Sequence, residues 1–186
     1  NTIVVVSGSN FALSSEDVEA VELDSDDVVV SVFEIPQPTI KTLFEKARAT
    51  GAKTVLNPAP AAPFIDGLLP LVDVVILNET ELAFFAGSEH AAKHTDTILA
   101  HVQTFRASPD QTVIVTLGAK GVICVRDDEV VRVDGVPVNA VDTTGAGDCF
   151  TGALAVGLFE VMPLPEAIHF ANVAASLSVQ TLGAST

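Results

Sequence analysis

The sequence predicts an α/β fold with a mostly parallel sheet, formed by one domain over residues 1–186. The first observation is that short β-branched runs alternate with segments of helical periodicity. The second is that no internal repeat and no flexible linker divides the sequence. The third is that 48% of the residues are hydrophobic, enough for a sizeable core, although no apolar run approaches the roughly 20 residues of a membrane helix.

The predicted strands are short and rich in valine, isoleucine and threonine. In chain order they are "TIVVV" (2–6), "VVVSVF" (28–33), "KTVLN" (53–57), "VDVVILN" (72–78) and "TVIVTLG" (112–118). A hairpin follows, in which "GVICVRD" and "EVVRVDG" meet at the acidic turn "DDE". The apolar runs have the length of buried strands.

The helices are predicted from their end signals as well as from their periodicity. Ser14 and Asp17 have the spacing of a capping box at the start of the first helix. A second helix runs over 38–50 and is closed by Gly51 in the C-cap role. The others are "ETELAFFAG", ended by its glycine, and segments over 92–106, 148–160 and 164–180, the last opened by Pro165.

The charge and the cysteines limit the classes of function. The formal net charge is −15, and such a surface repels nucleic acid and anionic membranes, so neither is an expected partner. Backbone N–H groups, a helix terminus and metal ions would have to supply most of the positive potential for a phosphorylated ligand. Cys124 and Cys149 form no CxxC pair and no signal peptide is visible, so we expect a cytoplasmic protein.

Five loops are expected to share one site: four of them follow predicted apolar strands, and the last follows the short "VNAV" (138–141). Ligands of parallel α/β sheets bind beyond the carboxyl ends of the strands. The loops are "FEIP", "NPAP", "NETE", "TLGAKG" and "DTTGAGD".

The glycine loop is predicted to lie at a helix N-terminus, because helical periodicity resumes at Asp148. Residues 145–148 would then present unpaired N–H groups that an anion can approach closely past small side chains. The alternative interpretation is that Asp148 is only the N-cap of this helix and binds no ligand. A Walker A motif is absent, and Phe150 stands where a dinucleotide GxGxxG would need glycine.

Four other features also have ordinary structural interpretations. Asn78 and Glu81 have the spacing of a capping box. "TLGAKG" fits a β-turn with Gly118 at positive φ. Asn172, a poor helix former within an alanine-rich helix, could be exposed on its surface. Glu34 could be a solvated acid after a strand.

The motif "DTTGAGDCFTGAL" resembles the C-terminal signature of the ribokinase-like, pfkB-type carbohydrate kinase family. "LNPAPA", "NETE", "VTLGAKGV" and "PLPEAIHFANVAAS" resemble the same family, and the match corresponds to its C-terminal two thirds. The resemblance implies a three-layer α/β/α sandwich and an enzyme that transfers the ATP γ-phosphate to the 5-hydroxyl of ribose. Another sugar or nucleoside kinase is the close alternative, and a non-catalytic remnant that binds a nucleotide or a partner is the distant one.

The resemblance also implies roles for individual residues. Asp148 is the catalytic base and contacts the sugar, and the backbone of Gly145, Ala146 and Gly147 forms an anion hole for the transferring phosphoryl group. Asn78 and Glu81 organise the Mg²⁺ and phosphate region. The expected nucleotide-binding residues are Asn78, Thr116, Leu117, Gly118, Ala119, Lys120, Gly121, Gly147, Asp148 and Asn172, the last at the adenine.

Two further sites follow from the resemblance. A monovalent cation, K⁺, is expected at Asp142, the Thr144 carbonyl, Ser178, Thr181 and Gly183, since hard cations prefer oxygen ligands. Glu34 matches an acid that binds ribose. The four histidines form no ligand-spaced cluster and are expected to be ordinary residues.

The sequence departs from the family at both ends. The family carries, before the part matched here, further sheet strands, a small lid sheet and a glycine-rich sugar motif. A C-terminal tail that completes the cation site is also expected beyond Thr186. The first residue is Asn1 rather than methionine, so we expect a trimmed or incomplete chain. The family's homodimers form through the lid, and the complete protein is a candidate for the same assembly.

Overall fold

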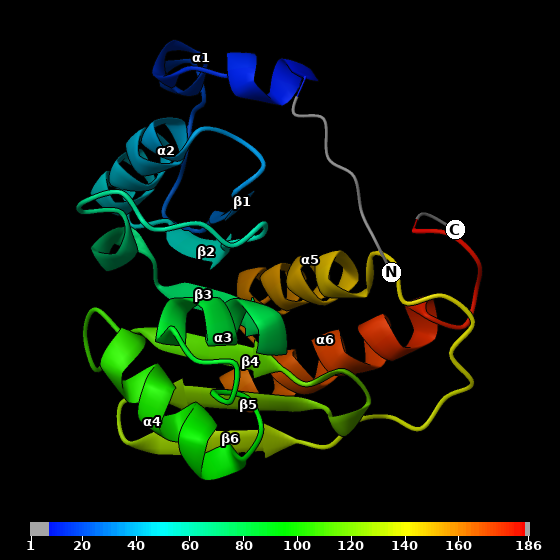
Figure 1. Cartoon of the computed structure of the whole chain (residues 1–186). Helices are drawn as coiled ribbons and strands as arrows, with labels where there is room; N and C mark the ends of the chain where they lie inside the picture. Colours follow the sequence, from blue (N-terminus) through cyan, green and yellow to red (C-terminus); the bar gives the residue numbers. More distant parts are fainter. Residues whose placement is uncertain (1–7, 185–186) are drawn as a thin grey trace.

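A single six-stranded sheet organises the chain, as Figure 1 shows for the computed structural model, which describes residues 8–184. The strand order follows the sequence. The strands are β1 (Val28–Val32), β2 (Lys53–Asn57), β3 (Val74–Asn78), β4 (Thr112–Thr116), β5 (Val122–Arg126) and β6 (Glu129–Val133). β1 to β4 are parallel, β5 is antiparallel to β4, and β6 is antiparallel to β5. The prediction of a mostly parallel α/β sheet is confirmed, while the predicted strand over 2–6 lies outside the described residues.

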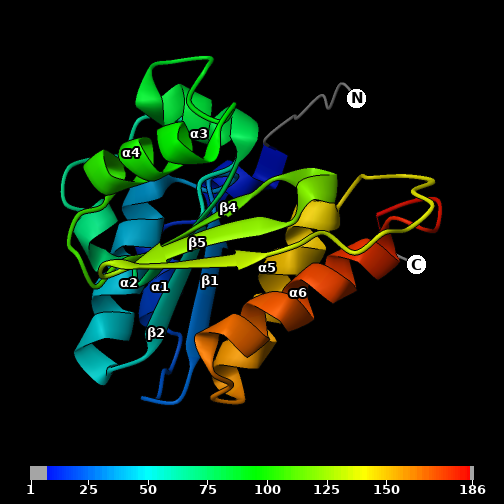
Figure 2. The ribbon, with the colours of Figure 1, turned by 90° about the horizontal axis from the view of Figure 1, so that it is seen from below.

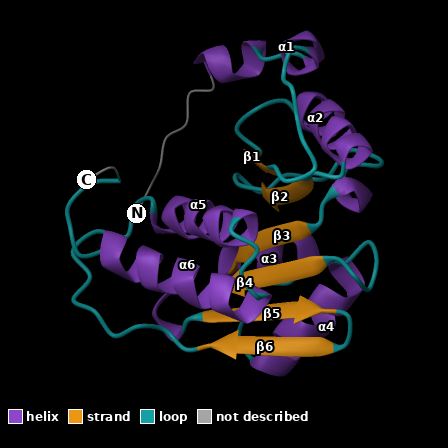
Figure 3. Ribbon diagram, turned by 180° about the vertical axis from the view of Figure 1, so that it is seen from behind, coloured by secondary structure: helices purple, strands orange, loops and turns teal. Residues whose placement is uncertain are grey.

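Helices cover both faces of this sheet, so the three-layer prediction is also confirmed (Figure 2). One layer contains α2 (Gln37–Thr50), α3 (Glu79–Ala86) and α4 (Thr95–Phe105), with the short α1 (Ser15–Glu19) beside α2. The other contains α5 (Ala146–Phe159) and α6 (Leu164–Ser178), which lie side by side across the sheet in Figure 3. Short 3₁₀ turns occupy Gly8–Ala12, Leu69–Leu71 and Gly118–Lys120.

The alternation of side chains along each strand divides the core into two. Val75 and Leu77 of β3 pack into the layer of α2, α3 and α4, where Phe44 is fully buried. Val74 and Ile76 of the same strand pack on the opposite face against α5 and α6. Since successive side chains of a strand point to opposite faces, a strand covered on both sides needs a continuous apolar run.

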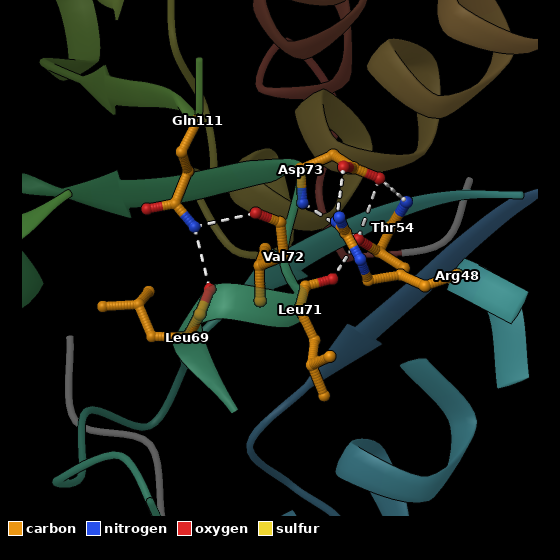
Figure 4. A network of polar contacts seen from close by, with 7 residues as sticks. All are labelled: Arg48, Thr54, Leu69, Leu71, Val72, Asp73 and Gln111. Carbon is orange, nitrogen blue, oxygen red and sulfur yellow. Dashed lines mark hydrogen bonds and ion pairs between the residues drawn. The ribbon is translucent and has the colours of Figure 1, made fainter. Parts of the chain in front are cut away.

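Hydrogen bonds made by side chains connect β2, β3 and β4 at the end of the sheet where these strands begin (Figure 4). The Asp73 carboxylate accepts from the Thr54 backbone N–H at 2.8 Å and from Arg48 at 3.1 Å. The buried Gln111 amide donates to the carbonyls of Leu69 and Val72 at 2.9 and 2.7 Å. Polar side chains therefore hold together the end of the sheet where these strands begin. The loops with the predicted site residues lie at the opposite end, where the strands finish.

Candidate active site

The glycine loop lies at the N-terminus of α5, as predicted. Gly145 is the N-cap residue, with φ of 77°, and the helix begins at Ala146. Asp148 is therefore the third residue of the helix, and its interpretation as the N-cap is wrong because glycine takes that position. The Asp148 side chain is exposed, and no hydrogen bond or ion pair holds it within residues 8–184.

The two glycines of this loop have different surroundings. Gly145 has a positive φ, and a Cβ at this position would lie 3.1 Å from the Ala184 Cβ. A Cβ on Gly147 would meet no atom within 4 Å, so the space beside this backbone is open. The N–H groups of Gly145, Gly147 and Asp148 donate to no acceptor in the described part of the chain. Free donors at a helix N-terminus favour an anion, which confirms the geometry that the sequence predicts for this loop.

A cavity of about 500 Å³ opens beside this helix terminus. Apolar side chains form much of its wall, with polar groups at Thr116, Asn172 and Ser176. A concave, largely apolar site with few polar groups is typical of small-molecule binding. The other lining residues are Gly118, Ala119, Gly121, Val122, Gly135, Val136, Pro137, Val138, Ala140, Thr143, Ala146, Gly147, Phe150, Ala175 and Val179.

Asn172 is buried in the wall of this cavity, so its interpretation as an exposed polar residue is wrong. Its amide nitrogen donates to the Asp134 carbonyl at 2.9 Å, which ties α6 to the loop after β6. The same loop touches the "TLGAKG" turn: a Cβ on Gly135 would lie 2.0 Å from the Ala119 carbonyl oxygen. The predicted positive φ of Gly118 is confirmed at 55°.

Asn78 and Glu81 form the predicted capping box at the start of α3. Asn78 Oδ1 accepts from the Glu81 N–H, and the Glu81 carboxylate accepts from the Asn78 backbone and amide, each at 2.8 Å. Asn57 at the end of β2 donates to the same carboxylate at 3.2 Å. Burial raises the pKa of the Glu81 carboxyl, and hydrogen bonds from Asn78 and Asn57 partly offset that effect.

No lysine or arginine of the described chain pairs with this buried carboxylate. A buried carboxylate that has hydrogen-bond donors but no cationic partner remains unfavourable, so the oxygen atoms of Glu81 and Asn78 fit a cation such as Mg²⁺. Within residues 8–184 there is no group of three or more histidine, cysteine or acidic side chains that could hold a metal ion by itself. A metal here would need ligands from a bound substrate as well.

Asp142 joins the loop before α5 to the end of the chain. Its carboxylate accepts from the Thr144 N–H at 3.0 Å, from the Thr144 hydroxyl at 2.7 Å and from the Gly183 N–H at 3.1 Å. These bonds hold the pKa of Asp142 below its usual range, the Thr144 backbone bond having the largest effect. The Val179 carbonyl accepts from the Asp142 N–H at 3.1 Å. The two segments with the expected cation ligands therefore lie together.

Comparison with known proteins is consistent with this site. Residues 1–186, the whole of the sequence, match the family described as "pfkB family carbohydrate kinase". The chain belongs to the pfkB family of carbohydrate kinases. It is 37% identical over 187 residues to a ribokinase of Staphylococcus aureus (strain COL), and 34% identical over 158 residues to a deoxyribokinase of Salmonella typhi. The alignments cover 99% and 83% of this chain, and 61% and 51% of those proteins.

A solved pfkB-type structure has the same fold. It is the Arabidopsis thaliana ribokinase complexed with ribose and ATP, with a TM-score of 0.82 and 29% identity. That comparison covers 98% of this chain and 60% of the Arabidopsis chain. The chain thus spans about 60% of the length of the ribokinases it matches.

The structure of this pfkB-family chain gathers most of the predicted nucleotide residues. The cavity is lined by Thr116, Gly118, Ala119, Gly121, Gly147 and Asn172. Leu117, Lys120, Asn78 and Asp148 do not line it. Lys120 instead forms an exposed ion pair with Glu79 at 3.4 Å, which joins the turn after β4 to the first residue of α3.

Glu34, Ser178 and Thr181 are also not among the residues that line this cavity. Glu34 is exposed after β1, and within the described residues no hydrogen bond or ion pair holds it. The Ser178 hydroxyl donates to the Ala175 carbonyl, and the Thr181 hydroxyl donates to the Ser178 carbonyl at 3.3 Å. The monovalent-cation role of these residues stays a prediction.

Sequence reasoning missed the segment from Gly135 to Ala140, which forms one wall of the cavity. The sequence predicted Gly135 as the end of the strand "EVVRVDG" and "VNAV" as a short run before the glycine loop, but the structure has no strand between Val133 and Gly145. The glycine in "VDGVPV" is the signal of a close approach of two backbones. No helix among the described residues has the length and hydropathy needed to span a membrane.

Proposed function

We propose that the natural protein is an ATP-dependent sugar kinase that transfers the γ-phosphate of ATP to the 5-hydroxyl of ribose. Kinship with a ribokinase supports this substrate, and the similarity to a deoxyribokinase keeps other sugars as the close alternative. A cytoplasmic location and a homodimer of the complete protein stay predictions.

One observation carries this proposal. The free N–H groups at the start of α5, the open space beside Gly147 and the exposed Asp148 carboxylate occur within one turn of helix at the edge of the cavity. A phosphoryl group bound to those N–H groups would lie next to a carboxylate that has no other partner in the described chain. The turn therefore provides both an anion site and a proton acceptor.

The proposed reaction uses these groups directly. The sugar hydroxyl oxygen forms a bond to the γ-phosphorus, the bond from that phosphorus to the bridging oxygen breaks, and ADP leaves. Asp148 accepts the hydroxyl proton, while the N–H groups of Gly145 and Gly147 stabilise the charge on the transferring group. A carboxylate at a helix N-terminus is a weak base, which suffices because phosphoryl transfer has a loose transition state and the proton leaves late.

We assign the other predicted residues to binding. The cavity between the "TLGAKG" turn, the 135–140 segment and α6 would take the nucleoside of ATP, with Asn172 near the base. Asn78 and Glu81 would hold Mg²⁺, which when bound neutralises phosphate charge. Glu34 would bind the sugar, and Asp142 would anchor a K⁺ site with the carbonyl oxygens nearby.

A coupled assay of ADP release on the natural protein tests the proposal. Ribose, 2-deoxyribose and adenosine are compared at equal concentration, and we expect the highest kcat/KM with ribose. A preference for another acceptor would replace ribose by that substrate within the same family. ATP binding with no release of ADP for any acceptor would instead favour the non-catalytic remnant.

A further inference from the structure

Asn57 links two strands to the buried carboxylate of Glu81. Its position is the last residue of β2, at the edge of the sheet where the site lies. The amide nitrogen donates to the Ile76 carbonyl at 2.9 Å and to Glu81 Oε2 at 3.2 Å. Both partners can only accept hydrogen bonds, so they fix the orientation of the amide.

The Glu81 side chain has few other restraints. It is 7% exposed, and its remaining donors are the backbone and amide of Asn78, its own partner in the capping box. Among the donors to this carboxylate within residues 8–184, Asn57 belongs to β2, whereas Asn78 belongs to β3. The Asn57 amide therefore fixes the position of the Glu81 carboxylate relative to β2 and to the loop over 57–60 that follows it.

We propose that Asn57 is a positioning residue for Mg²⁺: its amide holds the Glu81 carboxylate in the orientation that binds the metal ion. This inference rests on the proposed function, in which Glu81 and Asn78 form the Mg²⁺ region. A group that orients a metal ligand typically changes metal affinity by roughly 10–100-fold when it is removed. Asn57 does not touch the reacting atoms in this proposal, so its loss acts through Glu81.

The test uses Asn57→Ala in the natural protein, with Gln111→Ala as a matched control. Like the half-buried Asn57, the buried Gln111 has an amide that donates to two acceptors, the Leu69 and Val72 carbonyls (Figure 4). Gln111 precedes β4, at the end of the sheet opposite to Asn57, which is the last residue of β2. Calorimetry measures ATP binding as a function of Mg²⁺ concentration, and thermal denaturation measures stability. We expect Asn57→Ala to raise the Mg²⁺ concentration at half effect by roughly tenfold, with no such shift in Gln111→Ala.

Equal Mg²⁺ dependence in Asn57→Ala and the unaltered protein would overturn the inference, as would an equal shift in both variants. If Asn57→Ala does not fold, Asn57→Ser replaces it, because the serine hydroxyl keeps one donor. We then expect the Mg²⁺ concentration at half effect to rise, but by less than complete loss of the contact with Glu81 would cause. Absence of sugar-dependent ADP release would refute the kinase proposal alone, since the calorimetry needs no turnover. ATP binding that is independent of Mg²⁺ in the unaltered protein would refute the Asn57 role.

Discussion

The Asp148 side chain stands at the third position of a helix with no partner of its own in the described chain. An acid in the first turn stabilises a helix by about 0.3–1 kcal/mol through the dipole, so its loss should cost little stability. If Asp148 is the base, Asp148→Asn should lower kcat by about 10²–10⁴-fold, the usual contribution of general base catalysis. ATP affinity, measured by calorimetry, should change less than twofold.

Glu166 supplies the matched control for that variant. It is an exposed acid in the first turn of α6, and Glu166→Gln removes the same charge from an equivalent position. Near-normal turnover in both variants would reduce Asp148 to a residue that stabilises the helix dipole.

Asp142 leads to a prediction about cations. Its carboxylate joins the two segments that contain the expected K⁺ ligands, so if the predicted site is correct K⁺ should activate the enzyme more than Na⁺ does, and Asp142→Asn should weaken this difference. Initial rates at matched ionic strength measure the effect. Asp127→Asn, in the turn between β5 and β6, is the control. Equal rates in both salts for the unaltered protein would contradict the site.

At the scale of single residues, the sequence predicted where a residue lies in a helix or strand better than its burial or its contacts. The helix N-terminus at the glycine loop and the Asn78–Glu81 capping box follow from local spacing, and both are confirmed. The burial of Asn172 and the contact of Asn57 with Glu81 depend on segments 38 and 24 residues away in sequence. Such contacts between distant segments leave no local pattern that sequence reasoning could use.

At the scale of elements, α5 and α6 pack closely because Gly157 has no side chain. A Cβ on Gly157 would lie 2.8 Å from the Ala167 Cβ and 3.1 Å from its Cα, neither of which can move aside without the helix. Gly157→Ala should therefore destabilise the protein by about 1–3 kcal/mol, a typical cost of overpacking. The free energy of unfolding in urea measures it.

Gly152 of the same helix provides the opposite case. It is exposed, and a Cβ there would meet no atom within 4 Å. Gly152→Ala should stabilise the protein by up to about 1 kcal/mol, because alanine is the better helix former. A stabilising effect of both substitutions would show that α5 and α6 can separate without loss.

The ends of the elements show where periodicity was insufficient. α2 and β2 match their predicted ranges to within one residue, because Gly51 ends the helix sharply with φ of 89°. α5 was predicted from 148 but begins at Ala146, since its N-cap is a glycine without a side-chain signal. α4 was predicted from 92 but begins at Thr95, after turns at His90–Lys93 that precede its N-cap, His94.

At the scale of the molecule, the hydrogen bonds that stabilise the sheet and the loops that form the candidate site lie at opposite ends of the strands. One end of the strands is closed by Asp73, Gln111 and their partners, and the other carries the loops that form the cavity beside the N-terminus of α5. Alternation of strands and helices predicted this arrangement, because ligands of parallel sheets bind at the carboxyl ends of strands. The antiparallel hairpin adds the wall that the 135–140 segment completes.

The polypeptide 1–186, purified by itself, should self-associate. It spans about 60% of the length of related ribokinases, and β1 pairs only with β2 among the described strands. Val30 of β1 is 39% exposed, and Phe159 at the end of α5 is 55% exposed. An unpaired strand edge and exposed apolar side chains favour association, so sedimentation should show oligomers that grow with concentration.

The same polypeptide should bind Mg·ATP weakly and release no ADP in response to ribose. The cavity and the α5 turn are present, but of the expected sugar contacts the chain provides only Glu34 and Asp148, and Glu34 has no partner in the described residues. Orientation of the acceptor hydroxyl can lower a barrier by about 7–11 kcal/mol, and that contribution needs residues that hold the sugar in line. A coupled assay with and without ribose measures it, with the natural protein as the positive control. Robust ribose-dependent turnover by residues 1–186 would show that Glu34, Asp148 and the α5 turn suffice to orient the sugar.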